Sequence, residues 1–438
     1  MQEKRPTVSI LTQGCKVNQY ESEAIAERFE RSGFLVQGGN ALSDVYVVNT
    51  CTVTAESDRK AGQLIRRLHL KNPAAYILVI GCFSQVSPNT VAAISGVDYI
   101  SGNTDKARVV EVALALLQGG KKPDTPTLAV DSIKGAAFEP MQITKFDRTR
   151  AYVKIEDGCE NHCAYCTIPL ARGNVRSKAP ADILTEVEGL VRNGCREVVL
   201  TGIETASFGR DLCGYTLADL LEAVDTIPGI GRVRLGSLDP SLMRPDFVAR
   251  IARLRALTPH FHISMQSGSS RILAAMKRKY NRDMALSGIY RLREAMPAVE
   301  LTTDFIVGFP GETDADFADT LSFAREAEFL QMHVFAYSKR AGTVAAAMPD
   351  QIPTAIKKDR SAALIALGRD LRAARLQKAL DTSTREVLFE TYENGYAIGH
   401  TAEFFEVAAK SPIPLHSELR LVRLTGSTGD RLIGEISL

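Results

Sequence analysis

The sequence lacks an excess of either charge, a long apolar run and any internal repeat. Its 53 basic and 51 acidic side chains give a formal net charge of +2, so bulk charge names no partner and contact with nucleic acid would need local basic patches. No stretch approaches the ~18 apolar residues of a membrane span, and residues 1–15 contain no apolar core of a signal peptide. We therefore expect a cytoplasmic protein with no membrane partner.

The chain contains eight cysteines. In a reducing compartment, cysteines more often serve as metal ligands, catalytic groups or buried thiols than as disulfides. Their positions along the chain can therefore indicate metal or catalytic sites.

The pattern of apolar residues divides the chain into segments of different character. An alternation of short apolar strands and helices over residues 7–117 is typical of a doubly wound α/β domain. A stretch rich in glycine, proline and polar residues then indicates a linker, which has room for a short strand. We expect four segments: an N-terminal domain over 1–120, a linker over 121–145, a core domain over 146–380 and a small β-barrel over 381–438.

Helix signals are clear in the N-terminal segment. Asn18, with Glu21 three residues later, is typical of a helix N-cap, and Ser32-Gly33 is a stop signal, which together predict a helix over Asn18–Arg31. A second helix is predicted over Glu56–Lys71.

The core segment repeats the alternation on a larger scale. Six strand patterns, from "AYVKIE" to "MHVFAYS", alternate with helical stretches near 181–193, 216–226, 241–256, 269–296 and 314–328. Six βα units are too few for a closed eight-stranded barrel, so we expect a partial (βα)6 barrel that is open on one side. A long helix with seven basic and two acidic residues follows Pro353, and the alternating strands after Thr382 predict the small β-barrel.

The stretch "EDGCENHCAYCTIP" carries the strongest local signal. Cys159, Cys163 and Cys166 follow the first strand of the predicted core barrel with C-x3-C-x2-C spacing. A closed zinc site needs a fourth ligand, and His162 is the only candidate nearby. The spacing also differs from the C-x2-C-x2-C-x3-C-P of bacterial ferredoxins. Three cysteines on a four-iron cluster would leave one iron free to bind a substrate.

Three further cysteines share one position relative to the predicted strands. Cys15, Cys51 and Cys82 follow "TVSILT", "VYVVNT" and "YILVIG" with at most two residues between strand and cysteine. Because parallel strands end at the same edge of their sheet, we expect these thiols to meet there and to hold a second open cluster. Buried apolar thiols would not explain the common edge. Cys195 and Cys213 share no such position, and we expect them to be structural thiols.

The chain, with these two sets of cysteines, resembles the radical S-adenosylmethionine (SAM) enzymes. The signature of those enzymes is C-x3-C-x2-C after the first strand of a partial barrel. The N-terminal cysteine domain and the C-terminal barrel, which resembles the OB-like TRAM domain, are similar to those of the methylthiotransferases. Further matching stretches are "CTIPLARG", "SMQSGS", "DFIVGFPGET" and "HVFAYSKRAGT". The resemblance covers essentially the whole chain.

The stretches "GCKVNQYE" and "MKRKY" resemble the branch of that family that modifies N6-threonylcarbamoyladenosine at tRNA position 37. The resemblance implies methylthiolation of C2 of this base, by 5′-deoxyadenosyl radical hydrogen abstraction, sulfur insertion and methyl transfer. It also implies two [4Fe-4S] clusters and SAM as cofactors. The implied partners are the anticodon stem-loop of tRNA, an electron donor such as flavodoxin or ferredoxin, and a sulfur source.

Three alternatives stay open. Other branches methylthiolate isopentenyladenosine in tRNA or an aspartate of a ribosomal protein, and typically have Gln-Met or Pro-Lys after the first cysteine, where this chain has Lys-Val. Outside the enzyme class, the same cysteines would suit an RNA-binding protein stapled by metal and without catalysis.

The resemblance also implies contacts to SAM. Tyr165 resembles the residue that packs on the adenine, although loop packing is the alternative, and Gly202 matches the position where the backbone contacts the methionine amino group. Ser237, Gln266 and Asp304 are placed at the ends of later strands, on the active face. They are expected to bind the ribose or the methionyl group, or else to make turn hydrogen bonds. All five are predicted cofactor-binding residues.

A basic stretch, "RILAAMKRKYNR" (271–282), suits RNA. Lys277, Arg278 and Lys279 are predicted to contact phosphates and Tyr280 to stack on a base, the alternative being a solvated helix end. Arg172 is expected either to hold a carboxylate or phosphate or to form a surface ion pair.

The expected C-terminal barrel belongs to an RNA-binding fold class, yet its charge is unusual for that role. From Arg385 to Glu435 it has five basic and eight acidic side chains, a net charge of −3. The basic helix over 357–378 is therefore expected to share RNA binding with it.

Overall fold

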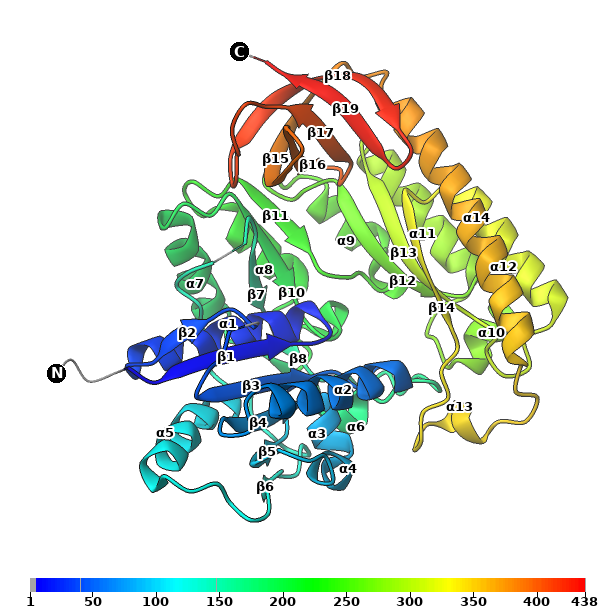
Figure 1. Cartoon of the computed structure of the whole chain (residues 1–438). Coiled ribbons are helices and arrows are strands. Elements are labelled where there is room, and N and C mark those ends of the chain that lie inside the picture. Colours follow the sequence, from blue (N-terminus) through cyan, green and yellow to red (C-terminus); the bar gives the residue numbers. More distant parts are fainter. Residues whose placement is uncertain (1–4, 40, 147, 438) are drawn as a thin grey trace. The chain divides into compact units, whose positions relative to one another are not determined.

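The computed structural model describes residues 5–39, 41–146 and 148–437, shown in Figure 1. The chain folds into two compact units. The first holds the residues up to Lys145 together with Lys154–Lys178 and Ser338–Thr343; the second holds Phe146–Val153, Ala179–Tyr337 and the chain from Val344 onward. The cysteine loop that follows the first barrel strand is thus part of the same unit as the N-terminal sheet.

A parallel six-stranded sheet in the order β2-β1-β3-β4-β5-β6 forms the centre of the first unit. Every residue of the central strands β3 and β4 is buried, as expected for a parallel sheet covered on both faces. The strands are β1 (Thr7–Thr12), β2 (Leu35–Gln37), β3 (Val45–Thr50), β4 (Tyr76–Gly81), β5 (Tyr99–Ser101) and β6 (Thr127–Ala129). The last of them lies in the stretch that the sequence predicted as a linker.

Two helices of this unit were predicted, and the predicted start of the first was wrong. The helices of the unit are α1 (Lys16–Arg31), α2 (Ala55–Lys71), α3 (Cys82–Val86), α4 (Pro88–Ala92), η1 (Lys106–Arg108) and α5 (Val109–Gly119). Helix α1 begins two residues before Asn18, with Cys15 in the N-cap position. Asn18 is buried, and its amide donates to the carbonyls of Gln13 and Thr50. The prediction of Asn18 as the cap was therefore wrong, whereas the predicted stop at Ser32 is confirmed.

The cysteine loop of the first unit is bracketed by short elements. They are β8 (Glu156–Asp157) and β9 (Arg176–Ser177), which pair antiparallel, and the helix α6 (Ile168–Arg172). This hairpin-like closure fixes both ends of the loop.

The second unit contains two three-stranded sheets, in the orders β11-β10-β7 and β12-β13-β14. Parallel bridges between Val233 and Leu257 and between Leu238 and Ile263 join the β11 side to the β12 side. The strands are β7 (Ala151–Lys154), β10 (Glu197–Thr201), β11 (Arg232–Leu235), β12 (His260–Gln266), β13 (Glu300–Val307) and β14 (Gln331–Ala336). These six strands confirm the expected open partial barrel.

Helices connect these strands, as the sequence predicted, with one difference. They are α7 (Pro180–Arg192), η2 (Thr205–Ser207), α8 (Leu217–Asp225), η3 (Pro240–Leu242), α9 (Pro245–Ile251), α10 (Ser270–Ala275), α11 (Arg282–Ala295) and α12 (Asp314–Ala327). The single helix predicted over 269–296 is two helices. Lys277 has a left-handed backbone (φ 59°) that ends the first helix, and the Asn281 side chain caps the second by accepting from the Met284 N–H.

The rest of the second unit is the short helix α13 (Val344–Ala347), the long helix α14 (Thr354–Ala379) and a closed five-stranded barrel (Figure 1). The barrel order is β15-β16-β17-β19-β18, which confirms the predicted fold of the C-terminal segment. Its strands are β15 (Thr384–Glu393), β16 (Tyr396–Thr401), β17 (Glu406–Lys410), β18 (Leu419–Thr428) and β19 (Arg431–Ile436). Leu376 and Ala379 of α14 share its apolar core.

Among the described residues, no helix combines the length and the apolar character that crossing a membrane requires.

A buried carboxylate ties the core sheet to the C-terminal barrel within the second unit. Glu197, fully buried at the start of β10, pairs with Arg150 at 2.5 Å and with Arg234 at 2.9 Å, and Arg150 also pairs with Glu390 of the barrel at 2.6 Å. Burial alone would raise the pKa of Glu197, but the charges of Arg234 and Arg150 outweigh it and lower the pKa to about 2.

We expect Glu197→Gln to destabilise the protein by about 3 kcal/mol at pH 7, since the pKa falls from 4.5 to about 2 on folding. A lowered pKa contributes stability above the unfolded value and loses it as the pH falls through the folded value. The gap between wild type and variant should therefore shrink to about 1 kcal/mol at pH 3.

Urea unfolding at pH 7 and pH 3 measures this gap. Glu188→Gln, an exposed position on α7, is the matched control and should change stability by less than about 0.5 kcal/mol. A gap of the same size at both pH values would contradict the prediction.

Candidate metal centres

The N-terminal cysteines gather at one edge of the sheet, as the sequence predicted. The register aligns Thr12 of β1 with Asn49 of β3, and Thr50 of β3 with Gly81 of β4, so the three strands end together. Cys15, Cys51 and Cys82 follow these ends within three residues. This edge is where parallel α/β sheets bind ligands.

Close packing places Gly14, the residue before Cys15, against Cys51. Gly14 has a left-handed backbone (φ 101°), and a Cβ at this position would lie 2.8 Å from the Sγ atom of Cys51. Only glycine allows the chain to pass Cys51 this closely before it reaches Cys15. Cys51 and Cys82 are buried, while Cys15 is exposed.

The thiols of this edge influence one another electrostatically. Desolvation, followed by the charge of Cys82, raises the pKa of Cys51 to about 12. Desolvation also raises the pKa of Cys15, and Cys82 adds to that rise. Cysteines bind a metal as thiolates, so metal binding at this edge must release the protons of these thiols. The metal affinity of the site therefore depends on pH.

These donors fit an iron–sulfur cluster. In the described part of the chain, no three His, Cys, Asp or Glu side chains converge around the position of a single metal ion. The three thiolates of a four-iron cluster bind three different irons, so they stand further apart than the ligands of one ion. Two sets of three cysteines, each without a fourth thiol, suit two clusters with one open iron each.

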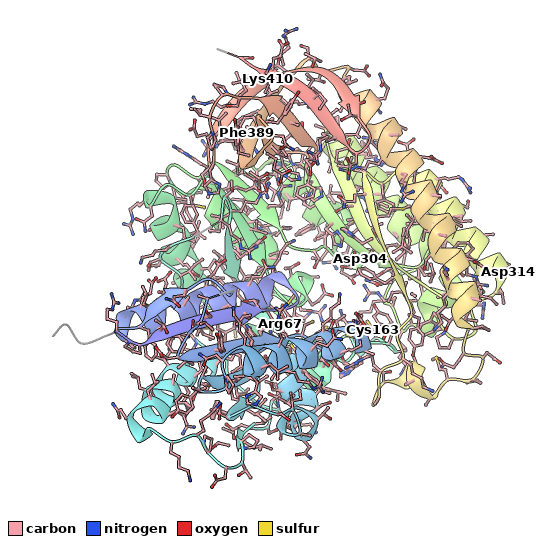
Figure 2. The ribbon with its side chains drawn as sticks, in the orientation of Figure 1. Arg67, Cys163, Asp304, Asp314, Phe389 and Lys410 are labelled. Atoms are coloured by element: carbon pink, nitrogen blue, oxygen red, sulfur yellow. The ribbon has the colours of Figure 1, made fainter. Side chains whose placement is uncertain are left out.

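The C-x3-C-x2-C loop presents its three half-buried cysteines among backbone donors (Cys163 is labelled in Figure 2). The Asn161 N–H lies 3.5 Å from the Sγ of Cys159, and the Ile168 N–H lies 3.4 Å from the Sγ of Cys166. Backbone donors of this kind stabilise a thiolate and orient it.

The loop's backbone also has positions that constrain it. At Gly158 (φ 85°), a Cβ would meet the carbonyl oxygen of Asn174 at 1.9 Å, so only glycine fits there. His162 is exposed with a left-handed backbone (φ 50°), and Tyr165 is half-buried between the last two cysteines. Contact of Tyr165 with an adenine stays a prediction.

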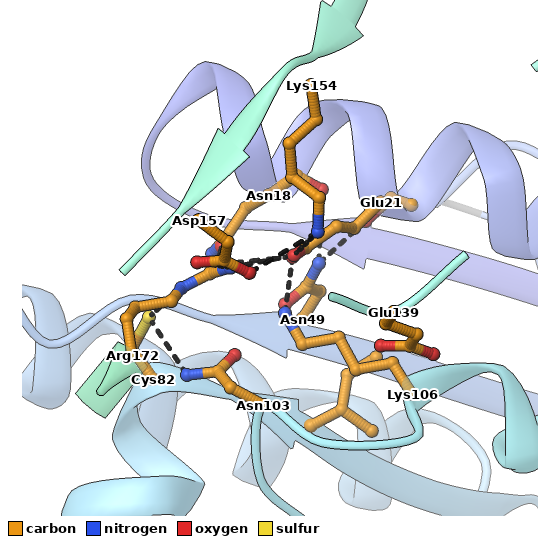
Figure 3. A network of polar contacts seen from close by, with 12 residues as sticks. Asn18, Glu21, Asn49, Cys82, Asn103, Lys106, Glu139, Lys154, Asp157 and Arg172 are labelled. Atoms are coloured by element: carbon orange, nitrogen blue, oxygen red, sulfur yellow. Dashed lines mark hydrogen bonds and ion pairs between the residues drawn. The ribbon is translucent and has the colours of Figure 1, made fainter. Parts of the chain in front are cut away.

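Next to these cysteines lies a buried network of charges, shown in Figure 3. Arg172 pairs with Glu21 at 2.7 Å and with Asp157 at 3.1 Å; Lys154 pairs with the same two carboxylates at 2.9 and 3.3 Å; Lys106 also pairs with Glu21. None of the five side chains is more than 5% exposed. Burying these five charged groups costs desolvation free energy, and only near-complete pairing of the charges offsets that cost.

The network changes the acidity of its members. Burial would raise the pKa of Glu21, but the charges of Arg172, Lys106 and Lys154 outweigh it and hold the pKa well below its usual range. Burial likewise opposes the charge of Arg172, yet Asp157 and Glu21 raise its pKa well above the ordinary value. Glu21 and Arg172 are therefore charged near neutral pH.

The sequence reasoning missed most of this network. Arg172 is fully buried, so its interpretation as a surface ion pair was wrong; it pairs with Glu21 and Asp157 of the chain itself, and binding of a ligand's carboxylate or phosphate stays a prediction. Glu21 was assigned to a capping box. A usable signal was Lys154, a charged residue between apolar residues of the strand pattern "AYVKIE".

In the second unit, the predicted SAM contacts follow the strand ends with one exception. Gly202 comes directly after β10, Ser237 two residues after β11, and Gln266 ends β12 with a left-handed backbone (φ 66°) at a register shift. Asp304 instead lies inside β13, three residues before its end, so its prediction as a strand-end residue was wrong. The binding roles of these residues stay predictions.

Asp304 (labelled in Figure 2) has a histidine partner that the sequence analysis did not anticipate. The Nε2 atom of His262 lies 3.2 Å from its carboxylate, and Nδ1 of His262 lies 3.0 Å from the Thr302 hydroxyl. The ring of His333 on β14 is 6.1 Å from that of His262. The alternation of "HFHISMQ" places both β12 histidines on one face of the strand and was the available signal.

Burial divides the predicted RNA-binding residues into two groups. Tyr280 is 4% exposed and donates its hydroxyl proton to the Ser264 carbonyl at 2.6 Å, while Arg278 pairs with Asp239 at 2.7 Å with both side chains buried. As folded, Tyr280 has no free face for a base, so its prediction as a stacking residue was wrong. Lys277 and Lys279 are exposed.

The open six-stranded barrel and the C-x3-C-x2-C loop define a radical SAM enzyme, and the model of the Radical SAM superfamily matches residues 153–324. The model of the uncharacterized protein family UPF0004 matches residues 7–102, the sheet with the other three cysteines. The radical SAM methyltransferase TsrM from Kitasatospora setae has the same fold, with a TM-score of 0.55 and 15% identity over 78% of this chain and 77% of that one.

Proteins of similar sequence identify the family to which the chain belongs within the radical SAM enzymes. The chain is 39% identical to the threonylcarbamoyladenosine tRNA methylthiotransferase MtaB of Bacillus subtilis over 92% of this chain and 90% of that protein. It is 40% identical to MtaB of Thermotoga maritima (88% and 87%), and 37% identical to tRNA-2-methylthio-N(6)-dimethylallyladenosine synthase of Moorella thermoacetica (89% and 88%). The chain belongs to the tRNA methylthiotransferase family, whose members use SAM and two [4Fe-4S] clusters.

Proposed function

We propose that the protein methylthiolates C2 of N6-threonylcarbamoyladenosine at position 37 of tRNA, giving 2-methylthio-N6-threonylcarbamoyladenosine. The observation that carries this proposal is similarity of 34–40% identity to four MtaB proteins over 87–99% of the chain. The two sets of three cysteines within one compact unit support it, because this chemistry needs both a radical source and a sulfur carrier.

Each cysteine set has a separate role in the proposal. Cys159, Cys163 and Cys166 hold the cluster that supplies, when bound, the electron for cleavage of the SAM sulfonium. The Cys15, Cys51 and Cys82 set holds the cluster that carries the sulfur. The protein itself orients SAM and the base and keeps water away from the radical.

The remaining predicted residues bind the two substrates. Tyr165, Gly202, Ser237, Gln266 and Asp304 contact SAM. Lys277 and Lys279, both exposed, contact phosphates of the anticodon stem-loop. The barrel over 381–438 and the basic helix before it add further tRNA contacts.

The proposal also includes partners in the cytoplasm. A radical SAM enzyme needs a reductant, and we propose a one-electron donor such as flavodoxin or ferredoxin. A separate sulfur source must replace the sulfur that leaves with each product.

Nucleoside mass spectrometry of tRNA tests the substrate. In a strain whose only gene of this type is deleted, 2-methylthio-N6-threonylcarbamoyladenosine should disappear and N6-threonylcarbamoyladenosine should accumulate. The wild-type gene should restore the product, and a Cys163→Ala gene should not. Persistence of the product at its original level would overturn the proposal.

A second candidate substrate is isopentenyladenosine in tRNA, because three relatives at 35–37% identity are named tRNA-2-methylthio-N(6)-dimethylallyladenosine synthase. Loss of only that methylthio nucleoside in the same deletion strain would establish this candidate. Loss of a methylthio group from a ribosomal protein aspartate, with both tRNA nucleosides unchanged, would instead indicate a protein substrate.

A further inference from the structure

We propose that Arg172 and Asn103 are positioning residues for the thiolate of Cys82 and that they raise the reduction potential of the cluster bound there. This inference rests on the proposed function only in requiring that Cys15, Cys51 and Cys82 hold an iron–sulfur cluster.

Two side-chain N–H donors from different parts of the chain converge on one sulfur atom. The Nε atom of Arg172 lies 3.4 Å from the Sγ of Cys82, and the Nδ2 atom of Asn103 lies 3.5 Å from it (Figure 3). Arg172 is completely buried, and Asn103 and Cys82 are each only 4% exposed. Water therefore cannot easily replace either donor.

The surroundings hold the Arg172 guanidinium in this orientation. Its Nη1 atom donates to Glu21 and Asp157, and its Nη2 atom donates to the Asn18 side chain at 2.5 Å. With both terminal nitrogens engaged, the remaining Nε–H points at Cys82. The three nitrogens of the guanidinium thus donate to different partners in a fixed geometry, which the single nitrogen of a lysine could not reproduce.

The Asn103 amide is also held in one orientation. Its Nδ2 atom donates to the carbonyl oxygen of Ala171 at 2.7 Å. Because a carbonyl only accepts, the nitrogen and not the oxygen must face Ala171, and this places the second N–H on the sulfur. The Oδ1 atom of Asn103 is buried without a hydrogen-bond partner. This missing hydrogen bond costs free energy, which the contacts of the Nδ2 atom must offset.

Arg172 places a positive charge beside the sulfur of Cys82. Burial opposes this charge, but Asp157 and Glu21 raise the pKa of the Arg172 guanidinium well above its ordinary value, so it stays charged at neutral pH. A buried positive charge acts strongly because the interior screens it weakly.

Both features favour the reduced form of a cluster. Reduction adds negative charge to the cluster and its thiolates, so N–H donors and nearby cations stabilise the reduced state more than the oxidised state. Removing either donor should therefore lower the potential.

The same helix also adjoins the other cysteines. Helix α6 begins two residues after Cys166 and ends at Arg172, while Thr167 donates its hydroxyl proton to the carbonyl of Thr52, next to Cys51, at 3.4 Å. Helix α6 and its N-cap residue Thr167 thus contact the N-terminal cysteine edge at two points and connect it to the C-x3-C-x2-C loop.

A redox titration followed by electron paramagnetic resonance tests the proposal. The background is the full chain with Cys159, Cys163 and Cys166 replaced by alanine, reconstituted with iron and sulfide, so that only the N-terminal cluster is observed. In this background, Asn103→Leu should lower the ratio of reduced to oxidised cluster about tenfold at the midpoint potential of the parent. This corresponds to a midpoint about 59 mV more negative for a one-electron couple.

Three further variants complete the design. Asn103→Asp keeps the side-chain size but replaces the donor with a negative charge, and it should lower the ratio further. Asn89→Leu, an exposed asparagine on α4, is the matched control and should leave the potential unchanged. Arg172→Lys keeps the charge but loses the fork and should also lower the ratio.

The outcomes separate this inference from the proposed function. An unchanged midpoint in Asn103→Leu and Asn103→Asp, with normal iron content, overturns the inference and leaves the proposed function intact. Loss of iron from both Asn103 variants but not from Asn89→Leu shows a purely structural role and overturns it too. A parent background that binds no iron contradicts the assignment of the cluster itself.

Discussion

Replacing Cys15, Cys51 and Cys82 together with alanine is expected to halve the iron of the reconstituted enzyme, from about eight to about four atoms per chain. Reductive cleavage of SAM to 5′-deoxyadenosine should continue, because the three cysteines of the C-x3-C-x2-C loop are untouched. Methylthio product should be absent. The reason is geometric: these three thiols follow strands that end together on one sheet edge, so they form one site.

The complementary triple replacement of Cys159, Cys163 and Cys166 should give the opposite result. About four irons per chain should remain, while cleavage of SAM and methylthiolation should both be lost. Iron assay and chromatography of 5′-deoxyadenosine measure the two effects. Cys213→Ala, at an exposed cysteine outside both sets, is the control and should change neither quantity. Bound zinc with no iron in the wild-type protein would refute both expectations.

The second large effect is expected for Glu21→Gln, which should destabilise the protein by about 3–5 kcal/mol. Glutamine has nearly the same size but carries no charge, so Arg172, Lys106 and Lys154 would lose their shared carboxylate in a fully buried site. Uncompensated buried charge is among the costliest changes that a single substitution can make.

Urea unfolding of the apoprotein measures this loss without any contribution from bound clusters. Glu30→Gln on the same helix removes an exposed carboxylate that pairs with Lys145 at 3.0 Å, and it should cost at most about 1 kcal/mol. Equal losses in the two variants would contradict the central role of Glu21.

Local patterns predicted the elements well where packing agrees with local preference. Helix α2 was predicted over Glu56–Lys71 and spans Ala55–Lys71, since its cap Thr54 and its apolar face are both encoded within it. The start of α1 was not predicted. There, Asn18 and Glu21 form a plausible capping pair by local rules, but burial assigns the amide to the backbone of neighbouring strands and the carboxylate to three cations.

Burial also decided the outcome at the basic stretch near the end of α10. The types of residue in "MKRKY" suit RNA, and no local rule distinguishes Lys277 and Lys279 from Arg278 and Tyr280. The left-handed turn at Lys277 and the core beneath it expose the two lysines and bury the other two residues. Asp239, which pairs with Arg278, lies 39 residues away, too far for a sequence pattern to indicate the contact.

The sequence by itself determined the position of the cysteines on the fold, because strand periodicity places Cys15, Cys51 and Cys82 after parallel strands, and spacing places the other three in one loop. Only the tertiary structure decided what surrounds the sulfurs. The donors to Cys82 come from Asn103 and Arg172, 21 and 90 residues away, and side chains so distant meet only through the packing of the sheet against α6. Periodicity carries information about which edge a residue occupies, whereas its partners across that edge depend on long-range packing.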